Sequence, residues 1–297
     1  MMHTITPDFL RRNPLPRPTE GAGKDERGRV LVVAGSREVP GAAWLTGIAA
    51  LRAGAGKLHI ATIRSMAPHL AMALPEARVT GLDETADGEI FPASSELIQD
   101  FAEGADAVVI GPGMLDDQAT RDLVHQLLDA TTSPRFVLDA AAITALGDDA
   151  KRLSVHAGRV SITPHAGEMA RLLGIERDVV EADPVAAATK ACELTQGVVA
   201  LKGGCTYVTQ PVDGNALTFW SCSNGNVGLA TSGSGDVLAG IAAGLLARGA
   251  EPLLAMQWAI FLHSEAGTRL AARIGPLGYL ASELLLEIPP IMASLTE

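Results

Sequence analysis

The chain has 297 residues, of which 47% are hydrophobic and 19% are charged, and its formal net charge is −11. This composition is typical of a folded domain, and it argues against a nucleic-acid-binding protein, because neutralising nucleic-acid phosphates takes clustered Lys and Arg. A small anionic ligand stays compatible with the acidic chain, since backbone amides and one or two lysines can form a locally positive site.

Residues 1–27 are polar and contain four prolines, which predicts an arm or irregular leader. The remainder alternates short apolar runs with helical patterns. Most of the apolar runs are continuous, as expected for parallel strands covered on both faces, and the alternation predicts one doubly wound α/β domain. The expected strands are 29–35, 57–62, 106–111, 135–140, 159–163 and 198–203, with helices expected at 41–56, 119–130 and 184–196. A hairpin is expected at Asp213-Gly214.

The cysteines and the hydropathy pattern bear on location. Cys192, Cys205 and Cys222 lack zinc-binding spacing, and an odd, sparse set favours a reducing compartment. We interpret each as a small buried side chain rather than a nucleophile. No run has signal-peptide or membrane-span character, so we expect a cytoplasmic protein without a membrane partner.

Glycine or polar residues follow the ends of several predicted strands. Each has a structural reading of its own: a tight turn at Gly113, a helix cap at Asp139, helix-entry residues at His165 and Glu168, and a solvated lysine at Lys202. The carboxyl ends of parallel strands meet at one edge of a sheet, however, and ligands bind there. The pattern therefore favours one site over a series of unrelated turns.

The segment 224–240, NGNVGLATSGSGDVLAG, is the most informative one. Its small residues open a helix, where unpaired amides and the helix dipole favour an anion, and glycines allow close backbone approach. Asp236 would repel a phosphate, so it makes sense as a base or as an acceptor for a substrate hydroxyl. Read alone, the segment is equally a glycine-rich turn with an ordinary first-turn aspartate.

These motifs together resemble one family. VLVVAGS, VVIGPGM, VLDAAAI, TPHAGEMARLLG, ALKGGCT and NGNVGLATSGSGDVLAG occur in the order found in the ADP- or ATP-dependent NAD(P)H-hydrate dehydratases. The resemblance covers nearly the whole chain. It implies a ribokinase-like fold, with a mainly parallel central sheet flanked by helices on both faces. It also implies ADP-dependent dehydration of (6S)-NADHX and (6S)-NADPHX, the hydrated reduced cofactors, to NADH and NADPH with release of AMP and phosphate; ATP is a possible alternative to ADP.

The resemblance also assigns residues. Asp236 would contact the substrate and act as base, beside an anion hole of amides at 232–235 that includes Gly233 and Gly235. The hydrated nicotinamide would lie against three further residues: Ala42, Gly113 and His165. The nucleotide would be bound by Gly235 and by the loop Lys202, Gly203, Gly204, Cys205 and Thr206. Glu168 and Asp139 would hold Mg²⁺ through water, and Asn224 and Asn226 would stiffen the anion-hole loop.

The chain departs from the family pattern in places. The leader keeps Lys24 without the histidine and tyrosine of many relatives, and Val227 stands where a proline is frequent. The chain has no room for the fused epimerase domain that some relatives carry, so we expect a separate epimerase in the same pathway, and a homotetramer. Two alternatives remain: a kinase of the hydroxyethylthiazole or hydroxymethylpyrimidine type, and a nucleotide-binding protein without catalysis.

Overall fold

One curved sheet organises the chain. The computed structural model describes residues 2–17, 19, 21, 23–131, 133–211 and 217–296. Within them ten strands pair in the order β1-β10-β9-β8-β7-β6-β5-β2-β3-β4. In chain order the strands are β1 (Met2–Thr4), β2 (Arg29–Val33), β3 (Lys57–Ile63), β4 (Ala77–Leu82), β5 (Ala107–Ile110), β6 (Arg135–Leu138), β7 (Val160–Ile162), β8 (Val198–Leu201), β9 (Thr206–Thr209) and β10 (Phe219–Cys222).

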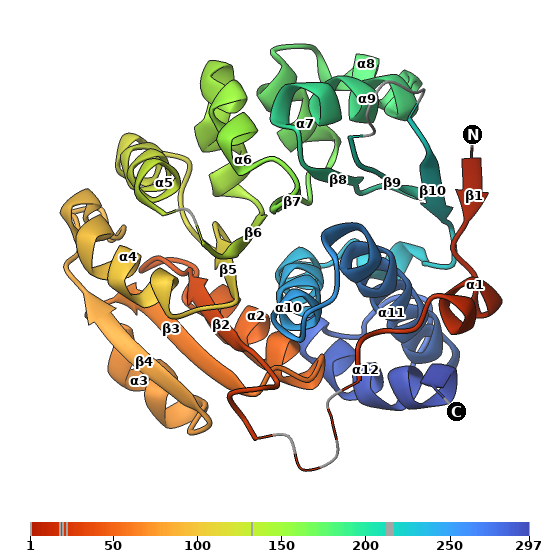
Figure 1. Cartoon of the computed structure of the whole chain (residues 1–297), viewed down its shortest axis with the longest axis horizontal. Helices are drawn as coiled ribbons and strands as arrows, with labels where there is room; N and C mark the ends of the chain where they lie inside the picture. The colour runs from red at the N-terminus through yellow and green to blue at the C-terminus, as the bar shows by residue number, and fades with distance from the viewer. Residues whose placement is uncertain are drawn as a thin grey trace.

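Helices cover both faces of the sheet, as Figure 1 shows. On the concave face pack α1 (Pro7–Arg12), α2 (Gly41–Arg52), α3 (Ala67–Ala73), α10 (Ser234–Ala247), α11 (Pro252–Arg273) and α12 (Ala281–Thr296). On the other face pack α4 (Ser95–Glu103), α5 (Gln118–Ala130), α6 (Ala141–Leu146), α7 (Ala166–Leu173), α8 (Arg177–Ala182) and α9 (Pro184–Thr195). Three 3₁₀ segments complete the elements: Pro92–Ser94, Gly147–His156 and Val227–Leu229.

Strand direction confirms the expected fold class. The strands from β8 across to β4 run parallel, and β9 runs antiparallel to both β8 and β10. Residues 30–33 of β2 are at most 1% exposed, because helices cover both faces of this strand. That burial explains why the central strands read as continuous apolar runs. The structure thus has the doubly wound architecture that the sequence predicts.

The carboxyl ends of the central strands are tied together by backbone hydrogen bonds. Gly35 N–H donates to the Pro112 carbonyl at 2.8 Å, and Lys202 N–H donates to the Pro164 carbonyl at 2.8 Å. His165 and Lys202 form an isolated parallel bridge just beyond the ends of β7 and β8. The loops that the sequence singled out therefore do lie along one edge.

Helix α10, which begins at this edge, packs unusually close to α2. A Cβ at Gly240 would lie 2.2 Å from the Thr46 carbonyl oxygen, and one at Gly244 would lie 2.4 Å from that of Ala50. The two backbones are therefore in direct contact, which requires glycine at both positions. The Thr46 hydroxyl also donates to the Asp236 carbonyl at 3.1 Å, which ties the first turn of α10 to α2.

The leader is more regular than the sequence suggested. β1 pairs in parallel with β10, and α1 starts after Thr6, whose hydroxyl accepts from Phe9 N–H. Leu10 of α1 is completely buried. The prediction of an irregular arm was wrong for these residues, because an N-cap threonine and a core-facing leucine outweigh the prolines around them. The predicted hairpin turn at Asp213-Gly214 lies outside the described residues, although the flanking strands β9 and β10 are antiparallel.

Helix α11 is 22 residues long and α12 is 16 residues long. In the described part of the chain, neither these nor the shorter helices combine the length and the apolar character that crossing a membrane requires.

Candidate functional site

A cavity of about 810 Å³ opens at the carboxyl edge of the sheet. Its walls come from the ends of β6, β7 and β8, the start of α10 and the middle of α11. The structure places nine of the residues expected from sequence along these walls: Asp139, His165, Glu168, Lys202, Gly203, Gly204, Thr206, Gly235 and Asp236. Side chains that are up to 97 positions apart in the chain, from Asp139 to Asp236, thus share one pocket.

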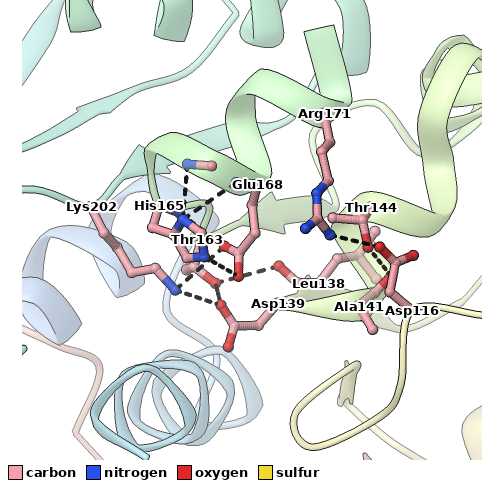
Figure 2. Close-up of polar contacts among 11 residues, drawn as sticks. Asp116, Leu138, Asp139, Ala141, Thr144, Thr163, His165, Glu168, Arg171 and Lys202 are labelled. Carbon is pink, nitrogen blue, oxygen red and sulfur yellow. Dashed lines mark hydrogen bonds and ion pairs between the residues drawn. The ribbon is translucent and has the colours of Figure 1, made fainter. Parts of the chain in front are cut away.

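Lys202 supplies the positive charge of this pocket. Its Nζ lies 2.9 Å from Asp139 Oδ1 and 3.9 Å from Glu168 Oε2, and Asp139 Oδ1 also accepts from the Thr163 hydroxyl at 2.7 Å (Figure 2). Burial opposes the charged form of Lys202, but the carboxylates of Asp139 and Glu168 outweigh it and hold the lysine pKa above its ordinary value. Lys202 is therefore a fixed cation in the cavity wall.

His165 and Glu168 form a reciprocal cap at the start of α7. Glu168 Oε2 accepts from the His165 backbone N–H at 2.9 Å, while His165 Nδ1 accepts from the backbone N–H groups of Gly167 and Glu168. Because Nδ1 accepts, the ring hydrogen lies on Nε2, which is 3.1 Å from Glu168 Oε1. Burial would raise the Glu168 pKa, but the His165 hydrogen bond and the Lys202 charge hold it below its ordinary value.

The start of α10 presents backbone donors to the cavity. Gly233 is its N-cap residue with φ +86°, and no side chain caps the helix, so its first amides are not bonded within the helix. A Cβ at Gly235 would lie 3.2 Å from Lys202 Nζ, which shows how closely the helix start approaches the lysine. Dipole, amides and ammonium group together favour an anion at this point.

Asp236 follows in the first turn of the same helix. Burial, together with the nearby Asp139 carboxylate, raises its pKa to about 6, against the opposing charge of Lys202. A carboxyl group with such a pKa is ionised near neutral pH and accepts a proton readily, which suits a general base.

Four of the residues expected to contact the substrate or the nucleotide do not line the cavity. Ala42 is 2% exposed, and a Cβ at Gly113 would lie 2.5 Å from the Ala42 Cβ, so these two pack against each other between the loops after β2 and β5. Gly233 turns the chain into α10, and Cys205 lies in the loop between Gly204 and Thr206. Close packing of loops is one reason for small residues at 42 and 113.

The loop before α10 is anchored by side chains. Asn224 donates to Glu265 Oε2 at 2.7 Å, and Asn226 Oδ1 accepts from Gly228 N–H and from the Tyr279 hydroxyl, each at 2.9 Å. Both asparagines therefore hold this loop against the C-terminal helices or against itself. This geometry fits the stiffening role that the resemblance gave them.

Sequence reasoning missed three features of the site. Thr163 orients Asp139, Ser234 bonds His263 across the cavity wall, and Ala140 adopts φ +48° directly after Asp139. A threonine at a strand end and a histidine inside an apolar helix carry no distinguishing signal in one sequence. A positive φ at an alanine cannot be recognised in one sequence either, and its backbone strain costs about 1–3 kcal/mol of folding free energy.

The sheet, the glycine-started helix at its carboxyl edge and the adjacent carboxylate define an α/β protein with a ribokinase-like fold. A sequence profile described as NAD(P)H-hydrate dehydratase matches residues 30–290. The chain belongs to the NAD(P)H-hydrate dehydratase family.

Individual relatives agree with this assignment. The ADP-dependent (S)-NAD(P)H-hydrate dehydratase of Xanthomonas campestris is 46% identical, over 98% of this chain and 96% of its own length. The bifunctional NAD(P)H-hydrate repair enzyme of Moorella thermoacetica is 39% identical, but the chain spans only 53% of that protein. The Bacillus subtilis ADP/ATP-dependent NAD(P)H-hydrate dehydratase, co-crystallised with ATP/Mg²⁺, has a TM-score of 0.79 at 28% identity, over 99% of this chain and 98% of that one.

Proposed function

We propose that this protein uses ADP to dehydrate (6S)-NADHX and (6S)-NADPHX, which restores NADH and NADPH and releases AMP and phosphate. The observation that carries the proposal is Asp236: a desolvated carboxyl group whose pKa is raised to about 6, at the amide-rich start of α10 and in one cavity with Lys202. The names of the Xanthomonas campestris and Bacillus subtilis relatives support the same reaction.

Asp236 acts first. Its carboxylate takes the proton of the C6 hydroxyl of the hydrate, and the oxygen attacks the β-phosphoryl group of ADP. The new O–P bond forms as the bond between the two phosphates breaks, and AMP leaves. The lone pair of the ring nitrogen then expels phosphate from C6 and forms a C=N iminium bond. Loss of a proton from C5, to water or to the departing phosphate, gives the C5=C6 double bond of the reduced nicotinamide. Ionisation of Asp236 near neutral pH is what permits the first step.

The amides at the start of α10 and the Lys202 ammonium group stabilise the charge that develops on the moving phosphoryl group. The loop from Lys202 to Thr206 binds the nucleotide, because Gly203 and Gly204 expose backbone on the cavity wall. His165 borders the same cavity, where its ring is fixed by Glu168 and can contact the nicotinamide ring.

Magnesium would neutralise charge on the phosphates of the nucleotide. Both Glu168 oxygens already contact His165, and Asp139 Oδ1 is bonded by Lys202 and Thr163. Asp139 Oδ2 makes no hydrogen bond to the residues that the structure describes. Among those residues there is also no cluster of three potential metal ligands. This donor set fits an ion that the phosphates and water would hold, with Asp139 and Glu168 contributing through water.

The experiment is direct. Purified protein is incubated with NADHX and either ADP or ATP, and the absorbance band of reduced nicotinamide is followed. We expect NADH to appear with equimolar AMP and phosphate when ADP is supplied, and an Asp236→Asn variant to bind ADP with little turnover. A stable phosphorylated product without NADH would indicate a kinase instead, and near wild-type turnover by the variant would refute the role of Asp236.

A partner activity also follows from the proposed reaction. The enzyme would act on one epimer of the hydrate, so a separate epimerase is expected to supply it, and the bifunctional repair enzymes among the relatives support this pairing. The homotetramer stays a prediction from the resemblance, and the cytoplasmic location stays a prediction from the cysteines and the hydropathy pattern.

A further inference from the structure

A serine and a histidine meet at the cavity wall. Ser234 Oγ and His263 Nε2 are 2.8 Å apart, and both residues line the cavity. Ser234 is the first residue of α10 and is 4% exposed, whereas His263 lies near the middle of α11. The mechanism above uses the backbone of the α10 start but neither of these side chains.

The direction of this hydrogen bond can be assigned. Burial lowers the His263 pKa to about 4, so the ring is neutral at neutral pH and carries one N–H. The Ser234 backbone acts against this lowering, and a backbone group raises a histidine pKa when its carbonyl faces a ring N–H. We therefore assign the ring hydrogen to Nε2, the nitrogen 2.8 Å from Oγ, so that Nε2 donates to Oγ. The serine hydroxyl accepts from the histidine and keeps its own hydrogen for another acceptor.

The surroundings of Ser234 indicate what that acceptor is. Gly233 and Gly235 flank the serine, a Cβ at Gly235 would lie 3.2 Å from Lys202 Nζ, and Asp236 is two residues further on. An oxygen bound by the α10 amides and by Lys202 would therefore lie next to the Ser234 hydroxyl. In the proposed reaction that oxygen belongs to the phosphoryl group in transfer.

We propose, as an extension of the proposed function, that Ser234 donates a hydrogen bond to the phosphoryl group as it passes from ADP to the hydrate, and that His263 is the positioning residue that directs it. His263 neither loses nor gains a proton, and no covalent bond forms to Ser234. The pair adds one side-chain donor to the backbone donors of the cradle, where charge develops during the transfer.

A purely structural role for the pair makes a different prediction. A bond that only joins α10 to α11 would cost stability when removed and leave turnover of the folded enzyme unchanged. Two buried residues away from the cavity serve as references for that behaviour. Ser161 lies in β7 with its hydroxyl buried, and His156 bonds the Leu128 carbonyl at 2.7 Å.

The test measures kcat, KM and ADP affinity of Ser234→Ala, His263→Leu and His263→Gln, with Ser161→Ala and His156→Leu as matched controls. We expect Ser234→Ala and His263→Leu each to lower kcat about 10- to 100-fold, less than loss of a main oxyanion donor because several amides remain. ADP affinity should stay within about threefold. The double variant should be no slower than Ser234→Ala, and the glutamine, which still donates, should recover most of the loss.

A wild-type kcat for folded Ser234→Ala would overturn the proposal. So would a His263→Leu effect that is as large in the Ser234→Ala background as in the wild type. Calorimetry with AMP and aluminium fluoride, a mimic of the phosphoryl group in transfer, separates this inference from the reaction itself. Weaker binding to Ser234→Ala supports the serine even if NADHX is not the substrate, and equal binding refutes the serine even if NADH is formed.

Discussion

Asp236→Asn should make the protein more stable while it abolishes turnover. The Asp236 pKa rises from an ordinary 3.8 to about 6, because the carboxyl group is buried and Asp139 lies nearby. The folded state therefore holds this proton more tightly than the unfolded state does, and stability is lost as the pH rises from about 4 to about 6. Each pKa unit corresponds to about 1.36 kcal/mol, so the ionised carboxylate costs at most about 3 kcal/mol above pH 7.

The asparagine removes this penalty. We expect the free energy of unfolding of Asp236→Asn to exceed that of the wild type by up to about 3 kcal/mol at pH 8, and by about half of that at pH 5. Urea denaturation at both pH values measures the difference, with the m-value as a check on two-state behaviour. Asp87→Asn is the control, because Asp87 is exposed and should change little at either pH. A gain that does not depend on pH, or a less stable variant at pH 8, would refute the argument that Asp236 is desolvated.

Three further predictions concern other residues. Lys202→Met leaves the Asp139 carboxylate, which is 3% exposed, without its cation. We therefore expect the free energy of unfolding to fall by about 3 kcal/mol or more and ADP to bind at least tenfold more weakly by calorimetry. Unchanged ADP affinity would contradict the assignment of Lys202. Ala140→Gly should stabilise the fold by about 1 kcal/mol, since glycine tolerates φ +48°, and Gln196→Gly, at the commoner left-handed helical angles, should gain less. The kcat/KM for the hydrate should fall tenfold per pH unit below about pH 6, where Asp236 becomes protonated. Asp139→Asn should shift this fall to lower pH, because it removes a carboxylate that raises the Asp236 pKa. A shift to higher pH would argue against that coupling.

The central strands were predictable because a strand that is buried on both faces appears in the sequence as a continuous run of apolar residues. Apart from Arg29 and Arg135 at their starts, β2, β5, β6 and β8 consist of apolar residues that are almost fully buried, and such runs stand out in one sequence. β4 (Ala77–Leu82) escaped prediction because it lies at the sheet edge, where Arg78 is exposed and Thr80 is half-buried. Likewise, α12 contains Pro289 and Pro290, a pair that normally argues against a helix.

The candidate site was predictable where backbone geometry demands particular residues. Glycines at a helix start and a lysine after a strand are recognisable in the sequence, and Gly235 and Lys202 both line the cavity. Thr163 and His263 could not be found in this way, because their roles depend on which side chain faces them across the fold. Ala42 and Gly113 were assigned to the substrate by resemblance alone; they pack on each other outside the cavity lining, and their contact with the substrate stays a prediction.

The backbone contact between α2 and α10 sets the mechanical character of the site. Gly240 and Gly244 lie directly against the Thr46 and Ala50 carbonyls, so α10 cannot move toward α2. Its first amides therefore keep their positions whether or not an anion is bound. The opposite wall is secured by side-chain bonds such as Asn224 to Glu265, which can break and re-form at small cost. The start of α10 is therefore the rigid part of the site, and the movements that admit a ligand take place in the loop that Asn224 anchors.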